Sequence, residues 1–109
     1  MNKALRYLGL AAKAGRLIVG AEDCAKELKR RKTGLIIAAV DAADNTVTQI
    51  RAAAESRGVL LLRTPYTKQA LADAVGRGTP VAIALICDEG LAKAFAAAVE
   101  SDRKQEERV

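Results

Sequence analysis

Two runs of six residues contain only aliphatic side chains, and they constrain the fold more than any other feature of the chain. They are residues 35–40, LIIAAV, and residues 81–86, VAIALI. A strand with one face in solvent alternates apolar and polar residues, whereas a strand that is apolar throughout needs cover on both faces. The two runs therefore predict central strands of a sheet that has helices on each side.

Helical and extended patterns alternate along the rest of the chain. Apolar residues recur at helical spacing, and glycines or capping residues separate the segments. These patterns predict further strands at residues 16–19 and 59–62, and helices at about residues 2–14, 20–32, 44–57, 67–75 and 88–100. Either Asp44 or Asn45 is the expected N-cap of the third helix, and Thr67 that of the fourth.

Alternating helices and strands with short connections predict an α/β fold, namely a three-layer α/β/α sandwich around a four-stranded mixed sheet. The chain has 109 residues, which is enough for one domain without disulfides or a structural metal. We place a single domain at residues 1–100. Residues 101–109 are charged and aperiodic, so we expect a flexible tail there.

Composition argues against several classes of protein. Phe95, Tyr7 and Tyr66 are the only aromatic residues, too few for binding single strands by base stacking. The longest apolar runs are about eight residues, far short of a membrane span. Cys24 and Cys87 form no CxxC pair and the chain has no histidine, so we expect no zinc site. Free thiols and the lack of a signal peptide indicate the cytoplasm.

The positive charge of the chain is concentrated near its start. The formal net charge is +5, yet residues 1–32 carry nine Lys and Arg against three Asp and Glu. The remaining residues are close to balanced. Clustered charge of this kind indicates a polyanion partner, although a pair of well-solvated helices explains it equally well.

Two enzyme hypotheses can be weighed on the residues. Cys24 lies near a helix start, which lowers the pKa of a thiol, but Glu22 and Asp23 beside it raise that pKa and no histidine can act as a base. A small buried hydrophobe is the simpler reading of Cys24. Asp41 and Asp44 follow a central strand and could hold a magnesium ion, but Asp44 is more simply a helix cap. The chain lacks the GxxxxGK[ST], GxGxxG and HExxH motifs. We therefore expect no enzyme and no cofactor.

Residues 20–32, GAEDCAKELKRRK, begin with glycine, carry two acidic residues just after it, and have five basic residues in the turns that follow. A helix that starts acidic and ends basic matches its own dipole, which is a purely structural explanation. The functional explanation is a surface for a phosphate-rich partner. Lys26 and Arg30 are four residues apart and so share one helical face, which could follow phosphates.

This segment resembles the G-x-N-E-x-x-K…R motif of the kink-turn RNA-binding ribosomal protein superfamily. The resemblance continues through the strand that ends in Asp41-Ala42 and resumes from Leu71 through residues 77–81, RGTPV. It covers about residues 3–99. The segments at residues 8–17, LGLAAKAGRL, and 41–46, DAADNT, look like the bacterial YlxQ-type branch.

The resemblance implies a three-layer fold that grips structured RNA between the motif helix and the loop before the last strand. Lys26 and Arg30 would contact phosphates, Gly20 and Ala21 would let the backbone approach, and Asp23 would accept hydrogen bonds from guanine. The charge pattern and the resemblance together predict the following RNA-binding residues: Gly20, Ala21, Glu22, Asp23, Lys26, Lys29, Arg30, Arg31, Arg77, Gly78, Thr79 and Pro80.

The chain departs from the family pattern at two of these positions. Glu22 stands where the family has asparagine, whose amide both donates and accepts, whereas a carboxylate only accepts. Arg77 stands where the loop usually has an aliphatic residue; its guanidinium plane can stack on a base or pair with a phosphate.

We therefore expect a monomeric, non-catalytic protein that binds structured RNA, either ribosomal or kink-turn-like. It would work on the ribosome or the transcription machinery, away from membranes. The alternative is a protein-interaction module of the same machinery, in which the acidic and basic parts of residues 20–32 pair with a complementary protein surface.

Overall fold

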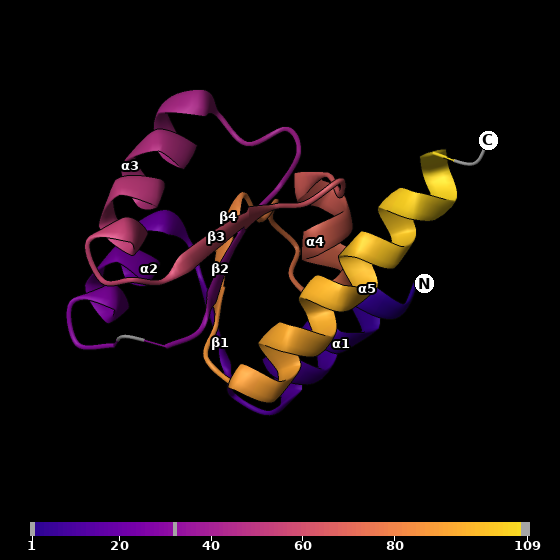
Figure 1. The fold of residues 1–109 in the computed structure, drawn as a ribbon, viewed down its shortest axis with the longest axis horizontal. Helices are drawn as coiled ribbons and strands as arrows, with labels where there is room; N and C mark the ends of the chain where they lie inside the picture. Colours follow the sequence, from indigo (N-terminus) through magenta and orange to yellow (C-terminus); the bar gives the residue numbers. More distant parts are fainter. Residues whose placement is uncertain (1, 32, 108–109) are drawn as a thin grey trace.

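The computed structural model describes residues 2–31 and 33–107, with side chains as far as Lys104 (Figure 1). Helices and strands alternate along these residues: α1 (Lys3–Lys13), β1 (Leu17–Val19), α2 (Ala21–Leu28), β2 (Leu35–Ala38), α3 (Asp44–Glu55), β3 (Leu60–Arg63), α4 (Lys68–Val75), β4 (Ile83–Ile86) and α5 (Glu89–Glu107). Met1 of the expected domain, Lys32 of the expected basic helix and residues 108–109 of the expected tail lie outside the described residues.

The four strands form one mixed sheet in the order β1-β4-β2-β3. Strand β4 is antiparallel to both of its neighbours, whereas β2 and β3 are parallel. Every residue of β2 and β4 is buried, as their aliphatic sequences predict. The expected four-stranded mixed sheet, with these two strands in its middle, is confirmed.

Helices cover both faces of the sheet. Figure 1 shows α2 and α3 on one side, and α1, α4 and α5 packed together on the other. Side chains from both layers meet the sheet in a core that is mostly aliphatic, with Phe95 at 0 % exposure among its largest members. The three-layer α/β/α sandwich is confirmed.

Helix α2 is shorter than its sequence predicts. It ends at Leu28, not near residue 32, and the backbone then tightens. The Arg30 N–H donates to the Glu27 carbonyl at 3.2 Å and the Arg31 N–H to the Leu28 carbonyl at 3.4 Å, and bonds of this three-residue spacing are typical of a helix that tightens in its final turn. This tightening places Arg30 above Glu27.

The N-cap expected for α3 is wrong, because Ala43 occupies the cap position and makes no side-chain cap bond. Asp44 is instead the first helical residue, where its charge suits the helix dipole. Asp41 uses its carboxylate elsewhere, accepting from the Lys68 N–H at 2.8 Å, at the start of α4. Thr67 caps α4 as predicted, accepting from the Ala70 N–H.

Helix α5 continues to Glu107, whereas the sequence predicts a flexible tail from Ser101. Polar contacts attach this last part of the helix to the rest of the molecule. The Tyr66 hydroxyl donates to the Asp102 carboxylate, and the Arg103 guanidinium donates to the Arg63 carbonyl at the end of β3. An apolar periodicity does not report contacts of this kind, which is why the sequence alone ends the helix early.

Gly34 allows the chain to enter β2 where no other residue fits. Its φ is +117°, and a Cβ built on it would lie 2.7 Å from the Ile86 carbonyl oxygen. We expect Gly34→Ala to lower the free energy of unfolding by about 2–5 kcal/mol, from backbone strain and overpacking together. Urea denaturation measures this. In the control Gly58→Ala, a Cβ meets nothing within 4 Å, and left-handed strain alone costs about 1 kcal/mol. Equal losses in the two variants would contradict the steric explanation.

Cys24 lies in the core on the inner side of α2, with 0 % exposure and its thiol directed at the Ile18 carbonyl. Burial, and then the nearby Cys87 and Asp23, raise its pKa to about 12. A thiol with this pKa is protonated at neutral pH, so it fits the predicted role of a buried hydrophobe and not that of a nucleophile.

We therefore expect native protein at pH 8 to be alkylated only at Cys87, which is half-buried. Cys24 should react only after urea is added, because both burial and the raised pKa suppress its thiolate. Mass spectrometry of iodoacetamide-treated protein measures this, with Cys87→Ser as the control that leaves no reactive thiol in the native state. Rapid alkylation of Cys24 in that variant would contradict the burial.

Candidate nucleic-acid interface

One end of the sheet brings together the segments that the sequence analysis singles out. Strands β1 and β2 end there and β4 begins there, because β4 is antiparallel to both. The Gly20 N–H donates to the Ile83 carbonyl, and the Ala39 N–H donates to the Ala82 carbonyl, each at 2.9 Å. The start of α2 and the chain that follows the 77–80 loop are therefore joined by backbone hydrogen bonds.

Gly20 makes the turn from β1 into α2. Its φ of 102° and ψ of 139° suit glycine alone, and a Cβ built on it would have nothing within 4 Å. Glycine is thus required by the backbone conformation, and the surface over it is open. The helix that it begins has Glu22 and Asp23 in its first turn, where the helix dipole favours negative charge.

Grooves lie on both sides of α2. The groove toward β1, of about 440 Å³, is lined by Ile18, Asp23, Lys26, Glu27 and Arg30. The groove toward α3, of about 350 Å³, is lined by Ala21, Glu22, Ala25, Thr46, Gln49 and Ile50. The two acidic residues of the first helical turn therefore face different grooves. Thr46 and Gln49 come from α3, and sequence reasoning missed both as site residues: Thr46 ends the 41–46 segment but is not among the expected site residues, and Gln49 belongs to no motif.

Lys26 and Arg30 share the groove toward β1, as their spacing predicts. Both side chains are well exposed, and each has one acidic neighbour. The Lys26 ammonium is 3.7 Å from the Glu22 carboxylate, a loose surface pair that contributes little. The Arg30 side chain is 79 % exposed, and its guanidinium lies 2.9 Å from the Glu27 carboxylate.

Arg31 points away from this open surface. Its side chain is 29 % exposed, donates to the Glu27 carboxylate at 3.1 Å and reaches the Cys87 carbonyl at 3.4 Å. It therefore fastens the end of α2 to the end of β4. The hydrogen bonds from Arg30 and Arg31, followed by their charges, lower the pKa of Glu27.

A further groove lies between the end of α2 and the end of α3. It is lined by Lys29 together with Ala25, Leu28, Ala53, Ser56 and Arg57. The Lys29 ammonium forms no hydrogen bond or ion pair within the part of the chain that the structure describes. Arg57 at the end of α3 donates to the Leu28 carbonyl at 2.6 Å and so satisfies the final turn of α2. Lys29 and the pair of Lys26 and Arg30 thus lie on different sides of one helix.

The 77–80 loop is exposed at all four positions, Arg77, Gly78, Thr79 and Pro80. Backbone bonds hold its two ends: the Arg77 N–H donates to the Ala72 carbonyl and the Val81 N–H to the Lys68 carbonyl. The loop is therefore anchored on α4 while its side chains remain open to a partner. Val40, two residues beyond β2, is a further apolar residue at this end of the sheet and is 48 % exposed; the sequence pattern missed it because it places Val40 in the covered strand.

Asp41 and Asp44 are engaged separately. Asp41 caps α4, and the Asp44 carboxylate is 3.7 Å from the Arg63 guanidinium. Within the described residues there is no group of three or more His, Cys, Asp or Glu side chains placed to hold a metal ion. Each carboxylate already has a structural partner, so the geometry favours the capping and ion-pair roles over a shared ion.

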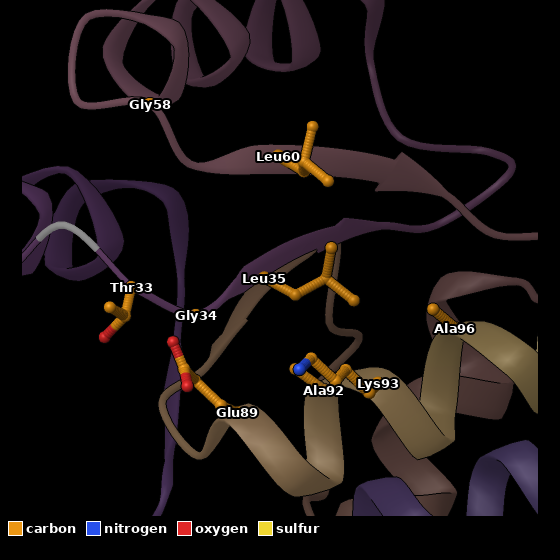
Figure 2. Close-up of a pocket in the computed structure, with 9 residues that line it drawn as sticks. All are labelled: Thr33, Gly34, Leu35, Gly58, Leu60, Glu89, Ala92, Lys93 and Ala96. Atoms are coloured by element: carbon orange, nitrogen blue, oxygen red, sulfur yellow. The ribbon is translucent and has the colours of Figure 1, made fainter.

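A depression separate from the grooves beside α2 lies at the opposite end of the sheet, where β2 and β3 begin (Figure 2). It has a volume of about 300 Å³ and is lined mainly by Leu35, Leu60, Ala92 and Ala96, with Glu89 and Lys93 from α5 beside them. Leu60, on the edge strand β3, is 76 % exposed. This surface is apolar and carries one charge of each sign, so it lacks the excess of cations that a polyanion requires.

None of the described helices is long and apolar enough to cross a membrane. None of the curated proteins compared with the chain is significantly similar to it.

Solved structures that are similar to most of this chain include the following two. A Bacillus halodurans protein with unknown function has 26 % identity and a TM-score of 0.84, with 92 % of this chain and 99 % of that one covered. A Giardia lamblia 15.5kD RNA binding protein has 27 % identity and a TM-score of 0.70, with 89 % and 82 % covered. Residues 2–96 match the Ribosomal protein L7Ae/L30e/S12e/Gadd45 family, so with the motif at Gly20 and the three-layer fold the chain belongs to that family.

Proposed function

We propose that the protein binds RNA and has no catalytic activity. The observation that carries this proposal is the coincidence of family membership with the exposed Lys26 and Arg30 in one groove beside a glycine-opened helix. The similarity to a Giardia lamblia RNA binding protein supports it. A protonated Cys24 and the separate engagement of Asp41 and Asp44 support a non-catalytic role.

In this proposal the RNA lies across the end of the sheet at which α2 begins and the 77–80 loop lies. Lys26 and Arg30 contact phosphates, with Lys29 adding charge on the far side of the helix and Arg31 holding the helix end. The open surface over Gly20 and Ala21 admits the RNA backbone. The carboxylates of Glu22 and Asp23 and the loop residues Arg77, Gly78, Thr79 and Pro80 select the shape of the RNA.

We further propose that the RNA is structured, either kink-turn-like or ribosomal, and that the chain belongs to the YlxQ-type branch. Residues 1–100 would act as one RNA-binding domain, in a monomer located in the cytoplasm and attached to the ribosome or the transcription machinery. Shape selection fits this surface better than base stacking does, because the exposed residues of the interface are charged, small or aliphatic.

Replacing Lys26 and Arg30 together with alanine should weaken RNA binding at every salt concentration. Loss of two phosphate contacts should reduce the slope of log affinity against log salt by about two. Fluorescence anisotropy from 50 to 300 mM KCl measures both effects. The control Lys93→Ala/Lys104→Ala removes the same charge from α5, on the other layer of the fold. An identical response of the two double variants would contradict the proposal that the Lys26 and Arg30 surface of α2 binds the RNA.

Replacing Glu22 with asparagine should raise the preference for a kink-turn RNA over a plain duplex of equal length. An amide restores a donor toward guanine O6, and one good base contact contributes about tenfold in discrimination. The measured quantity is the ratio of the two dissociation constants at 150 mM KCl. Glu55→Asn, an exposed position on α3, makes the same change in charge and should leave the ratio unaltered. A ratio that does not respond to Glu22→Asn contradicts the assignment of Glu22 to shape selection.

A further inference from the structure

Glu27 lies between two arginines at the end of α2, and both of its carboxylate oxygens are engaged. One oxygen, Oε1, accepts from Nε of Arg30 at 3.3 Å and from Nη2 of Arg30 at 2.9 Å. The other, Oε2, accepts from Nε of Arg31 at 3.1 Å. The Glu27 side chain is only 13 % exposed, so it is well packed even though it belongs to a surface helix.

This contact uses only one edge of the Arg30 guanidinium. Nε and Nη2 form the side edge, which faces Glu27. The end edge, made of Nη1 and the outer N–H of Nη2, has no partner within residues 2–31 and 33–107. A guanidinium can bind a phosphate in a bidentate manner through that edge while a carboxylate holds the other.

Arg31 fixes Glu27 in turn. Its guanidinium bridges the Glu27 carboxylate and the Cys87 carbonyl at the end of β4, so the carboxylate is tied to the sheet and not only to its own helix. Cys87, Arg31, Glu27 and Arg30 therefore form a continuous chain of contacts from the sheet to the surface. The tightened backbone after Leu28 supports it, because it stacks Arg30 three residues above Glu27.

The charge of Glu27 and its contact with Arg30 predict opposite effects on RNA affinity. Considered only as a negative charge, Glu27 repels phosphates and weakens the field of its two arginines. Considered as a support, it removes rotamer freedom from Arg30 before binding, so that less entropy is lost when a phosphate is bound. Glu22, the acidic partner of Lys26, differs, because its side chain is 87 % exposed and its contact with the Lys26 ammonium, at 3.7 Å, is too loose to hold that side chain in place.

We propose that Glu27 is a positioning residue for RNA binding, which holds the side edge of Arg30 so that its end edge faces a phosphate across the groove shared with Lys26 and Asp23. This inference rests on the proposed RNA-binding function. It adds a residue that touches no RNA and has the sign of charge that RNA binding would be expected to avoid.

The test compares Glu27→Gln and Glu27→Asp with wild type in anisotropy titrations with a kink-turn RNA. Glu27→Gln removes the charge, whereas Glu27→Asp keeps it and withdraws the carboxylate by one methylene. If Glu27 positions Arg30, both variants bind about fivefold more weakly, in line with the loss of one ordered charge-assisted contact. Glu55→Gln, with the same loss of charge on α3, should bind no more weakly than wild type.

A double-mutant cycle with Arg30→Ala provides the readout that a merely structural role would not change. Arg30→Ala should cost less in the Glu27→Gln background than in wild type, because the arginine is no longer oriented there. Urea denaturation of each variant confirms that it is folded before titration. Tighter binding by Glu27→Gln, together with wild-type binding by Glu27→Asp, would overturn the inference and leave only the charge of Glu27. A wild-type protein that binds no RNA would overturn the proposed function as well.

Discussion

Strands β2 and β4 lie side by side in the middle of the sheet, and the need to cover both of their faces places every other element. Ile36, Ile37, Leu85 and Ile86 are fully buried, and each such side chain stabilises the fold by about 1.5–3 kcal/mol relative to exposure. No single layer of helices can bury residues that point to opposite sides of a strand. Two helical layers are therefore required, and the chain supplies α2 and α3 for one and α1, α4 and α5 for the other.

The position of the candidate interface follows from the direction of β4. Because β4 is antiparallel to its two neighbours, its start lies beside the ends of β1 and β2. The hydrogen bonds from Gly20 to Ile83 and from Ala39 to Ala82 then draw three connections to one end of the sheet. A parallel β4 would have carried the 77–80 loop to the other end, where the apolar depression around Leu60 lies.

The charges of α2 are organised more closely than their number indicates. Five basic residues follow two acidic ones in the sequence, yet the described cations have different roles. Lys26 and Arg30 face an open groove, Lys29 faces α3, and Arg31 is bound to the sheet. Glu27 lowers the net positive charge of this surface, yet it contacts two of the cations, Arg30 and Arg31. Electrostatic attraction and the ordering of the arginines are thus separate properties of the same helix.

Local pattern predicted much of the fold, because the relevant physics is local in the sequence. Aliphatic runs identified the central strands, helical periodicity identified the helices, and Thr67 was recognised as a cap from its place before α4. Contacts between distant residues were not predictable. Asp41 caps a helix that starts 27 positions later, and Asp102 and Arg103 extend α5 by bonding to the Tyr66 hydroxyl and the Arg63 carbonyl.

The same division applies to the site. The sequence by itself determined that a glycine opens α2, that Lys26 and Arg30 share a face, and that β2 and β4 are central, since backbone conformation, helical spacing and burial all follow from residue type. Only the tertiary structure decided that the Arg30 side chain is exposed at the surface while Arg31 is tied to the sheet. That depends on the Cys87 carbonyl, which lies beside Arg31 because β4 packs against α2, and on the tightening of the helix after Leu28 that sets Arg30 on Glu27.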